Sequence, residues 1–373
     1  MVRDRPLIAV VGGGITGAFA AYHLATLGAT ALLLERDATG AHASANNTGG
    51  LNPMHGPGIP GPLEDLAMTS FELHRRAWQD IRRRGGDFAG RVVSRLDVAL
   101  DPLDADRLAQ SVERYDAVPG LTARWLPPEE LRGQEPRLSA SLLGGLLTEG
   151  NLRVEPGAYT RAVTAAAVDL GARVQRAGVA EIRHRNGIVT GVVCDSRVTA
   201  CDGLVLATGP WCAEPARWLH VALPVEPVRG ELLLMDQPVP GITHDITCGP
   251  FGVYPTTDGR VWLGGTEERV GFEAAPSPGG RANIQAGVRR VISAFESGRI
   301  IRQTAALRPV SADGLPIVGR APGWQNVALA LAGGRKGMLL AAGLGRAAAE
   351  ILVLGQTSVP ISACHADRPG LAS

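Results

Sequence analysis

The chain has 373 residues, which is enough for two compact units or for one large unit with an insertion. Hydrophobic residues make up 45% and charged residues 20%, an ordinary globular mixture that can bury a sizeable core. Lysine and arginine together number 37, aspartate and glutamate 36, so the formal net charge is +1. This balance argues against a nucleic acid or an anionic membrane as an obligatory partner.

Cysteine usage and hydropathy indicate a cytoplasmic protein. The five cysteines form no C-x-x-C pair and show no metal-ligand spacing, so we expect free thiols, no disulfide framework and no metal site. The apolar start of the chain imitates a signal peptide, but a glycine motif explains its composition better. No uninterrupted apolar stretch reaches the ~20 residues that a membrane span needs. The composition is compatible with a homo-oligomer.

The first elements in chain order form a β-α-β unit. Residues 7–11 (LIAVV) are wholly apolar, as in a buried parallel strand, and a helix is expected over residues 15–27. A second buried strand over residues 31–34 ends at Glu35. Between the first strand and the helix lies a Gly-x-Gly-x-x-Gly motif formed by Gly12, Gly14 and Gly17.

Each part of this motif suits a bound dinucleotide. The first glycine permits a tight turn, the second lets the backbone approach a pyrophosphate, and the third lets helix and strand pack closely. The helix N-terminus offers unpaired N–H groups to phosphates. Glu35 can accept hydrogen bonds from ribose hydroxyls, which disfavours a 2′-phosphate. An ordinary glycine-rich turn is the alternative, but the surrounding strands and helix favour a Rossmann-type site.

Further elements follow from periodicity and turn signals. A long loop is expected over residues 38–62 and a hairpin at Asn186-Gly187. The tail after Pro360 has no periodicity and is expected to fray. The remaining predictions are helices at 63–84, 103–115, from 127, 157–170, 284–296 and 337–354, strands at 91–100, 173–175, 204–209 and 326–331, and strand-like runs over 225–266 with turns at 236–240 and 258–259.

Rossmann-like pieces therefore occur at the beginning, middle and end of the chain, with β-rich material between them. This order predicts an α/β fold in which two domains are intertwined rather than consecutive. The glycine motif does not by itself distinguish FAD from NAD.

Several segments along the chain resemble, in the same order, the glycine oxidase, D-amino-acid oxidase and sarcosine oxidase family of flavoproteins. The resemblance is strongest to glycine oxidase. The resemblance covers nearly the whole chain, and its most specific part is ALRP…DGLPIVG followed by Gly-Arg-Lys-Gly. The matching segments are VVGGGITGAFAAYHLA, ASANNTGGLNP, LRVEPGAYTRAV, LATGPW, PVRGELL, VYPTTDGRVWLGGT, ALRPVSADGLPIVGR and AGGRKGMLLAAGLG.

The resemblance implies a Rossmann-like FAD-binding domain in three segments, with an inserted α+β substrate domain containing a mainly antiparallel sheet. The FAD-binding domain would comprise residues 1–90, 147–222 and 304–359. The substrate domain would comprise residues 91–146 and 223–303, and residues 360–373 would form a tail.

The family pattern also implies which residues hold FAD. The flavin would lie along the first glycine motif, with its ring reaching the C-terminal strand and helix. The expected cofactor-binding residues are Gly12, Gly14, Ile15, Thr16, Gly17, Glu35, Arg36, Ser44, Asn46, Asn47, Thr48, Gly49, Val179, Thr208, Gly209, Gly333, Gly334, Arg335, Lys336, Gly337 and Met338.

Two arginines are the catalytic candidates. Arg308 matches the family's substrate-carboxylate arginine, and a guanidinium offers a planar, bidentate fork to a carboxylate. Arg335 lies on the loop that faces the flavin and can also face substrate. Lys336, the only lysine in the chain, follows at a helix N-terminus where positive charge would stabilise reduced flavin. For each, a solvated or salt-bridging side chain is the alternative.

The chain also departs from the glycine oxidase pattern. Where those enzymes carry a substrate-contacting tyrosine, this chain has Phe251 or Gly252, and Tyr254 lies two or three positions on. Gly333 and Gly334 replace bulkier residues. These changes predict a roomier pocket, with Phe251, Tyr254 and Gly334 beside the substrate. Ala306 and Leu307 stand where some relatives attach FAD through cysteine, so we expect non-covalent FAD, with His42 a minor alternative attachment point.

The resemblance implies oxidation of an amino acid or small amine, with hydride transfer to the flavin, hydrolysis of the imine and reoxidation by oxygen to give hydrogen peroxide. A dehydrogenase that passes electrons to a quinone or a partner subunit is the alternative, and an idle flavin subunit is another. An arginine-rich segment over residues 74–95 leaves RNA binding by a tRNA-modifying oxidase module as a remote hypothesis.

Overall fold

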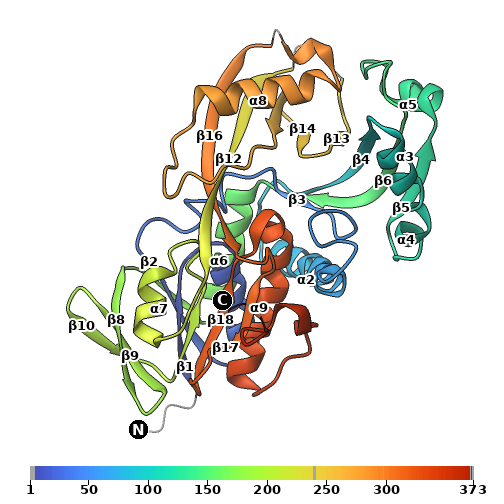
Figure 1. Ribbon diagram of the computed structural model, residues 1–373. Helices are drawn as coiled ribbons and strands as arrows, with labels where there is room; N and C mark the ends of the chain where they lie inside the picture. Colours follow the sequence, from blue (N-terminus) through green and yellow to red (C-terminus); the bar gives the residue numbers. More distant parts are fainter. Residues whose placement is uncertain (1–4, 238–240, 297, 370, 372–373) are drawn as a thin grey trace.

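The computed structural model describes residues 5–237, 241–296, 298–369 and 371. Within these residues the chain forms two bodies stacked on each other, one built on a six-stranded sheet and one on a nine-stranded sheet (Figure 1). A parallel Rossmann-like sheet and a separate, mainly antiparallel sheet confirm the predicted α/β fold class.

The six-stranded sheet is parallel except at one edge, where the last two strands are antiparallel. Helices and loops cover both of its faces, which explains why its central strands are apolar without alternation. In spatial order the strands are β17 (Ile317–Arg320), β18 (Val327–Leu331), β11 (Gly203–Leu206), β1 (Leu7–Val11), β2 (Thr30–Glu35) and β7 (Arg173–Arg176).

Four helices pack together on one side of this sheet (Figure 1). They are α1 (Ile15–Thr26), α2 (Glu64–Arg83), α6 (Pro156–Asp169) and α9 (Gly337–Val353). The backbones of α1 and α9 touch, because a Cβ on Gly345 would lie 2.6 Å from the backbone nitrogen of Ala20. His74 on α2 joins the layer: its ring nitrogens lie 2.9 Å from Tyr159 Oη and 2.9 Å from Leu339 O.

A three-stranded antiparallel sheet lies on the other side, together with α7 (Ala213–Leu219). Its strands are β8 (Val179–Arg185), β9 (Ile188–Cys194) and β10 (Arg197–Ala200). The predicted hairpin is confirmed: Arg185 pairs with Ile188, and both Asn186 and Gly187 have the positive φ of a type I′ turn.

The nine-stranded sheet forms the second body. All of its neighbouring strands are antiparallel except β13 and β4. In spatial order the strands are β16 (Ile300–Ser311), β12 (Val225–Asp236), β15 (Arg260–Gly264), β14 (Phe251–Pro255), β13 (Asp245–Cys248), β4 (Arg91–Ala99), β6 (Gly144–Arg153) and β3 (Gly50–Leu51), with β5 (Thr122–Leu126) paired to β6.

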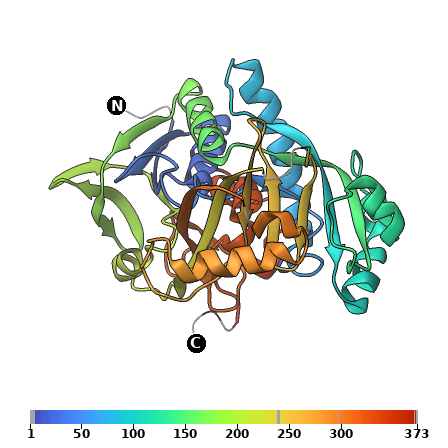
Figure 2. The same cartoon turned by 90° about the horizontal axis from the view of Figure 1, so that it is seen from above.

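Helix α8 (Pro278–Arg289) crosses the outer face of this sheet, and three short helices flank its far end (Figure 2). The short helices are α3 (Pro102–Ala109), α4 (Val112–Asp116) and α5 (Pro128–Gln134). Strands β6 and β16 run through the predicted domain boundaries at residues 147 and 304 and belong to the nine-stranded sheet over their whole length. Because α8 packs on the outer face of the nine-stranded sheet, the inner face of that sheet can cover a site on the first body.

Three local predictions differ from the structure. The helix expected over residues 284–296 begins at Pro278, because Ser277 caps it by accepting from Gly280 N at 2.9 Å. The helix expected over residues 103–115 is divided into α3 and α4. The turn expected over residues 236–240 lies partly outside the described residues.

The prediction that the tail frays is wrong for its described part. Val318 forms a bridge with His365, Cys364 is buried, and Arg368 Nε lies 2.8 Å from Asp313 Oδ2. The residues that make these contacts follow no helical or strand periodicity, so the sequence pattern does not predict them. In the described part of the chain, each helix is too short or too polar to cross a bilayer.

Candidate functional site

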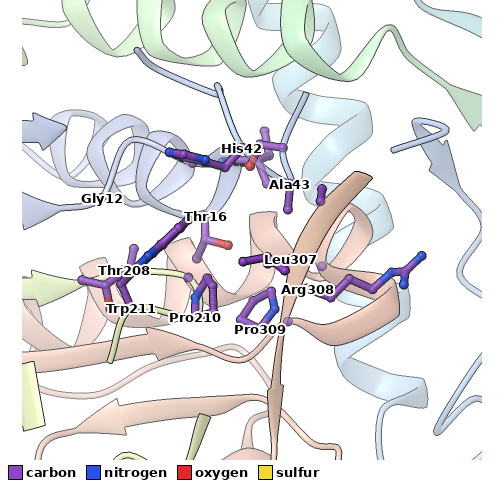
Figure 3. Close-up of a pocket in the computed structure, with 18 of the residues that line it drawn as sticks. Gly12, Thr16, His42, Ala43, Thr208, Pro210, Trp211, Leu307, Arg308 and Pro309 are labelled. Carbon is purple, nitrogen blue, oxygen red and sulfur yellow. Dashed lines mark hydrogen bonds between the residues drawn. The ribbon is translucent and has the colours of Figure 1, made fainter. Parts of the chain in front are cut away.

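A cavity of about 580 Å³ lies where the carboxyl ends of the parallel strands meet the inner face of the nine-stranded sheet. Open α/β sheets bind ligands at this edge. Figure 3 shows Arg308 at one end of the view and Thr208 and Trp211 at the other, with Thr16 and Leu307 between them. The cavity therefore runs from the glycine loop to strand β16.

Most of the predicted cofactor residues line this one cavity. Gly17, Gly49 and Lys336 do not line it. The predicted residues that do are Gly12, Gly14, Ile15, Thr16, Glu35, Arg36, Ser44, Asn46, Asn47, Thr48, Val179, Thr208, Gly209, Gly333, Gly334, Arg335, Gly337 and Met338.

The glycine loop leaves no room for side chains. Gly12 has φ +107°, and a Cβ there would collide with the backbone of Ala207 on the neighbouring strand. A Cβ on Gly17 would collide with Gly12 O, so Gly17 acts through packing rather than by facing the cavity. Gly14 caps α1, and its Cβ position lies 3.1 Å from Ser44 Oγ. This tight loop brings backbone N–H groups to the cavity wall.

Glu35 ends β2 beside that loop. Its Oε2 accepts a 2.6 Å hydrogen bond from Gly13 N, and its Oε1 accepts a 2.8 Å bond from Asp37 N. The carboxylate is thus held in place by two backbone groups while it lines the cavity. Its role toward a ribose stays a prediction of the sequence.

A cluster that the sequence analysis missed lies next to Glu35. Trp211, the last residue of LATGPW, lies 4.6 Å from Arg36 Cζ and 4.7 Å from the ring of His42, measured from its ring centroid. His42 Nε2 lies 2.8 Å from Asp37 Oδ2, and this hydrogen bond lowers the pKa of Asp37. In the sequence, Trp211 two positions after Ala-Thr-Gly was the signal from which this cluster could have been predicted.

The loop that follows β2 continues the wall. Ser44 Oγ accepts from Ile15 N at 2.9 Å, so this loop is bound to the first turn of α1. Asn47 Oδ1 accepts from Gly49 N at 2.8 Å. Gly49 has φ +72°, and a Cβ there would collide with Val154 O, which explains its place outside the cavity.

The other end of the cavity is formed by the turn before α9. A 3-10 helix over Gly334–Lys336 leads into α9, so the N-terminus of α9 opens toward the cavity. Gly334 has φ +57° and Ala332 has φ +57°. Unpaired N–H groups and the helix dipole make this end attractive to negative charge.

Arg308 lines the cavity from β16. Its Nη1 donates a 2.8 Å hydrogen bond to Thr266 O, and within the described residues the guanidinium has no ion-pair partner. Burial lowers the pKa of Arg308, and the charge of Glu267 partly offsets this effect. A guanidinium always remains protonated in proteins, so the cavity wall holds a positive charge without a paired carboxylate.

Arg335 lines the same cavity from the turn before α9. Its Nε lies 3.5 Å from Glu267 Oε1, and its Nη2 donates a long 3.4 Å hydrogen bond to Pro250 O. The two arginines therefore flank the segment that follows β15, because Arg308 binds Thr266 and Arg335 faces Glu267.

Lys336 points elsewhere. Its Nζ donates hydrogen bonds of 2.6 Å to Asn52 O and 2.7 Å to His55 O, in the loop between β3 and α2. Burial lowers the pKa of Lys336 to about 7, and the nearby Arg95 adds to this effect. Its side chain thus fastens that loop to the start of α9.

Strand alternation separates the predicted substrate contacts. Tyr254 lines the cavity, and burial raises the pKa of its phenol. Phe251 lies on the opposite face of β14, where its ring covers Gly287 of α8. Side chains an odd number of positions apart point to opposite faces of a strand, so these two residues cannot share the cavity.

Several arginines of the arginine-rich segment on α2 form ion pairs with acidic side chains of the same helix. Arg76 lies 3.1 Å from Glu72, and Arg84 lies 2.9 Å from Asp80. Arg83 is also within 4.0 Å of Asp80. These pairs offset much of the charge that RNA binding would require.

The chain matches the DAO family, described as FAD-dependent oxidoreductases, over residues 8–351. It is 27% identical over 362 residues to glycine oxidase of Geobacillus kaustophilus, covering 95% of each chain. The crystal structure of that species' glycine oxidase superposes with a TM-score of 0.88 at 25% identity, covering 98% of this chain and 99% of the other. Hydrogen cyanide synthase subunit HcnC of Pseudomonas aeruginosa is 28% identical over 359 residues, covering 84% of each chain.

The cavity fits the cofactor of this family. Glycines at one end admit no Cβ without collision, a fixed carboxylate lies beside them, and a second helix N-terminus opens at the other end. Such a cradle suits an elongated, anionic dinucleotide. The family match, the near full-length relatives and this cradle agree, and the chain belongs to the DAO family of FAD-dependent oxidoreductases.

Proposed function

We propose that the protein oxidises an amino acid or a small amine at the carbon that bears the nitrogen, and that dioxygen takes up the electrons. The relatives named glycine oxidase, at 25–27% identity over nearly the whole chain, support this class of substrate. The name of HcnC, a subunit of hydrogen cyanide synthase, keeps a partner-dependent dehydrogenase as the alternative.

The guanidinium of Arg308 carries this proposal. It lines the cavity, it has lost part of its contact with water, and within the described residues it lacks an acidic partner. A buried positive charge is costly unless it is paired. A substrate carboxylate would supply the missing partner through a charge-assisted, bidentate hydrogen bond.

The residues that would hold FAD lie along the cavity. Glu35 would accept from the ribose, the N–H groups around Gly12 and Gly14 would receive the pyrophosphate, and the N-terminus of α9 would face the ring. Bound FAD would supply a hydride acceptor. Non-covalent binding is supported by the absence of cysteine from the cavity wall among the described residues.

The protein's own contribution is mainly orientation. Arg308 would fix the carboxylate so that the Cα–H bond of the substrate faces the ring, with the amine bound in its deprotonated form. We assign no general base. Within the described lining, His42 is the one histidine, and it lies at the Glu35 end beside Trp211. The imine product would hydrolyse in water to an oxo acid and ammonia, or to an aldehyde and an amine.

Two measurements test this function. Anaerobic addition of glycine, sarcosine, D-amino acids and imino acids should bleach the flavin absorbance with at least one of them. Admission of air should then restore the absorbance and produce hydrogen peroxide. Rapid bleaching with slow recovery in air would favour the dehydrogenase alternative. No bleaching by any compound would contradict amino-acid oxidation.

A further inference from the structure

Glycines on the cavity-facing side of the nine-stranded sheet are covered by neighbouring side chains that lie flat on the strands. Residues paired across a ladder share a face, and every second residue along a strand does too. The covered glycines and their covering residues are Gly230 on β12 under Arg308, Gly264 on β15 under Leu232, and Gly252 on β14 under Tyr254.

Gly230 lies directly beneath the guanidinium. A Cβ on Gly230 would come within 3.0 Å of Nη1, Cζ and Nη2 of Arg308, closer than Cβ atoms approach other heavy atoms. Arg308 pairs with Val228 across the ladder, so its side chain reaches Gly230 on the diagonal. Gly230 is not among the residues with positive φ, so the requirement for glycine there is steric and comes from Arg308.

Gly252 lies beneath the phenol ring of Tyr254, as Gly230 lies beneath the guanidinium of Arg308. A Cβ on Gly252 would come within 3.0 Å of Oη, Cζ and Cε2 of Tyr254, two positions further along the strand. The Tyr254 ring therefore lies back over Gly252 instead of standing upright in the cavity. Arg153 helps to hold this strand, since its Nη2 donates a 3.1 Å hydrogen bond to Tyr254 O.

The two side chains cover glycines on the same face of the sheet. Arg308 extends from β16 over β12, and Tyr254 extends back along β14 toward the row that contains Gly264 and Leu232. Both side chains line the cavity. Side chains that lie flat on the sheet leave space above them in the cavity, so a substrate can lie between the sheet and the cofactor.

We propose that Gly230 and Gly252 are positioning residues, which set the orientation of Arg308 and Tyr254 as two groups that bind one substrate carboxylate. The proposal rests on the proposed function, because it takes Arg308 as the carboxylate-binding group. The chain thereby keeps a phenol in the same cavity wall as the arginine although the residue at position 252 has no side chain.

The first experiment measures stability and needs no substrate. Gly230→Ala, Arg308→Ala and the double variant are compared by thermal unfolding of the holoenzyme, with Gly133→Ala on α5, where a Cβ meets no heavy atom within 4 Å, as the glycine-to-alanine control. Gly230→Ala should lower Tm only slightly, because the displaced guanidinium is the far end of a flexible side chain and loses its hydrogen bond to Thr266 O. In the Arg308→Ala background the same change should be nearly neutral. If Gly230→Ala does not fold, the double variant should restore folding.

The second experiment measures carboxylate binding. Acetate is titrated into each holoenzyme and followed by the change in flavin absorbance. Arg308→Ala should weaken binding by about 100-fold, and Gly230→Ala by about 10-fold or more, since the fork loses its alignment. The double variant should bind no more weakly than Arg308→Ala alone. Gly133→Ala should bind acetate like the unaltered enzyme.

The phenol is tested in the same way. Tyr254→Phe should weaken acetate binding by about 5- to 10-fold, the loss of one hydrogen bond. Gly252→Ala should have a similar effect, and adding it to Tyr254→Phe should leave acetate affinity nearly unchanged, because the hydroxyl is already gone. Both single variants should keep the flavin spectrum.

The outcomes separate the two proposals. Additive losses of stability and affinity in the Gly230→Ala/Arg308→Ala variant would overturn the positioning role, as would a double variant that fails to fold. Wild-type affinity for acetate in Arg308→Ala, or no acetate binding to the unaltered enzyme, would instead count against Arg308 as a carboxylate site and so against the proposed function.

Discussion

Glu35 Oε2 accepts a 2.6 Å hydrogen bond from Gly13 N, so the end of β2 is joined directly to the glycine loop after β1. The same carboxylate accepts from Asp37 N through Oε1. One side chain thus fixes the geometry of two neighbouring turns and also faces the cavity.

Glu35→Gln should weaken FAD binding. An amide has one acceptor oxygen, so one of the two backbone N–H groups, or the ribose, loses its partner. We expect the Kd of the apoprotein for FAD to rise by about 10-fold, the value of one charge-assisted hydrogen bond. Quenching of flavin fluorescence measures it. Glu181→Gln on β8, an exposed carboxylate, is the control; an unchanged Kd for Glu35→Gln would refute this role.

Arg308→Ala should lose turnover while it keeps the yellow flavin. Two charge-assisted hydrogen bonds to a carboxylate contribute several kcal/mol, so kcat/KM for amino acids should fall by about 100-fold or more. Arg308→Lys should recover only part of this loss, because an ammonium lacks the planar fork. Steady-state oxidation of an active amino acid measures both. Wild-type turnover in Arg308→Ala would contradict the assignment.

Lys336 should make stability depend on pH. Its pKa is about 7 in the folded protein against 10.5 in the unfolded chain, so between these values the unfolded state binds more protons. Stability due to this group should therefore rise with pH above 7, by up to about 1.4 kcal/mol per pH unit. Urea unfolding between pH 7 and 9.5 measures it as the difference between wild type and Lys336→Met.

Because the chain has one lysine, its titration can be followed directly. Lysine labelled with ¹³C at Cε should give a single side-chain NMR signal that changes with a midpoint near pH 7. A midpoint above pH 10 would contradict the buried position of Nζ, and the stability of Lys336→Met would then parallel that of the wild type at every pH.

Ser277→Ala should destabilise the second body. Ser277 Oγ accepts from Gly280 N at 2.9 Å and donates to the buried Glu231 Oε1 at 2.8 Å. Loss of the cap costs about 1 kcal/mol, and the loss of one hydrogen bond to Glu231 adds a smaller amount, because its carboxylate still accepts from Ser277 N and Gln303 Nε2. Thermal unfolding should show a lower Tm. Ser277→Thr keeps the hydroxyl and should retain most of the stability.

Local signals were sufficient for the first βαβ unit. Apolar runs, the spacing of Gly12, Gly14 and Gly17, and the acidic end of the second strand all lie within one short stretch of sequence. Helix α2 was predicted within a residue at each end, because its apolar positions recur with helical period. The start of helix α8 was predicted too late in the chain, because the prediction followed the apolar residues from Ile284 onward and not the Ser277-Pro278 cap.

The site depended more on long-range pairing. Arg308 could be identified from its motif. Its contact with Gly230 depends on the pairing of β12 with β16, and the two residues are almost 80 positions apart in the chain. Phe251 and Tyr254 could not be separated by motif alone; the face of β14 that meets α8 decided which of them lines the cavity. Lys336 points to Asn52 and His55, which no local pattern indicates.

The amino-acid sequence alone was enough for the fold class, the dinucleotide motif and the family resemblance, because these rest on periodicity and on residues close together in the chain. Folding was needed to bring Arg308, Arg335 and Tyr254 to one cavity, to turn Phe251 and Lys336 away from it, and to dock the C-terminal tail. Side-chain direction depends on strand register and on which face is covered, and both arise only when distant segments pack.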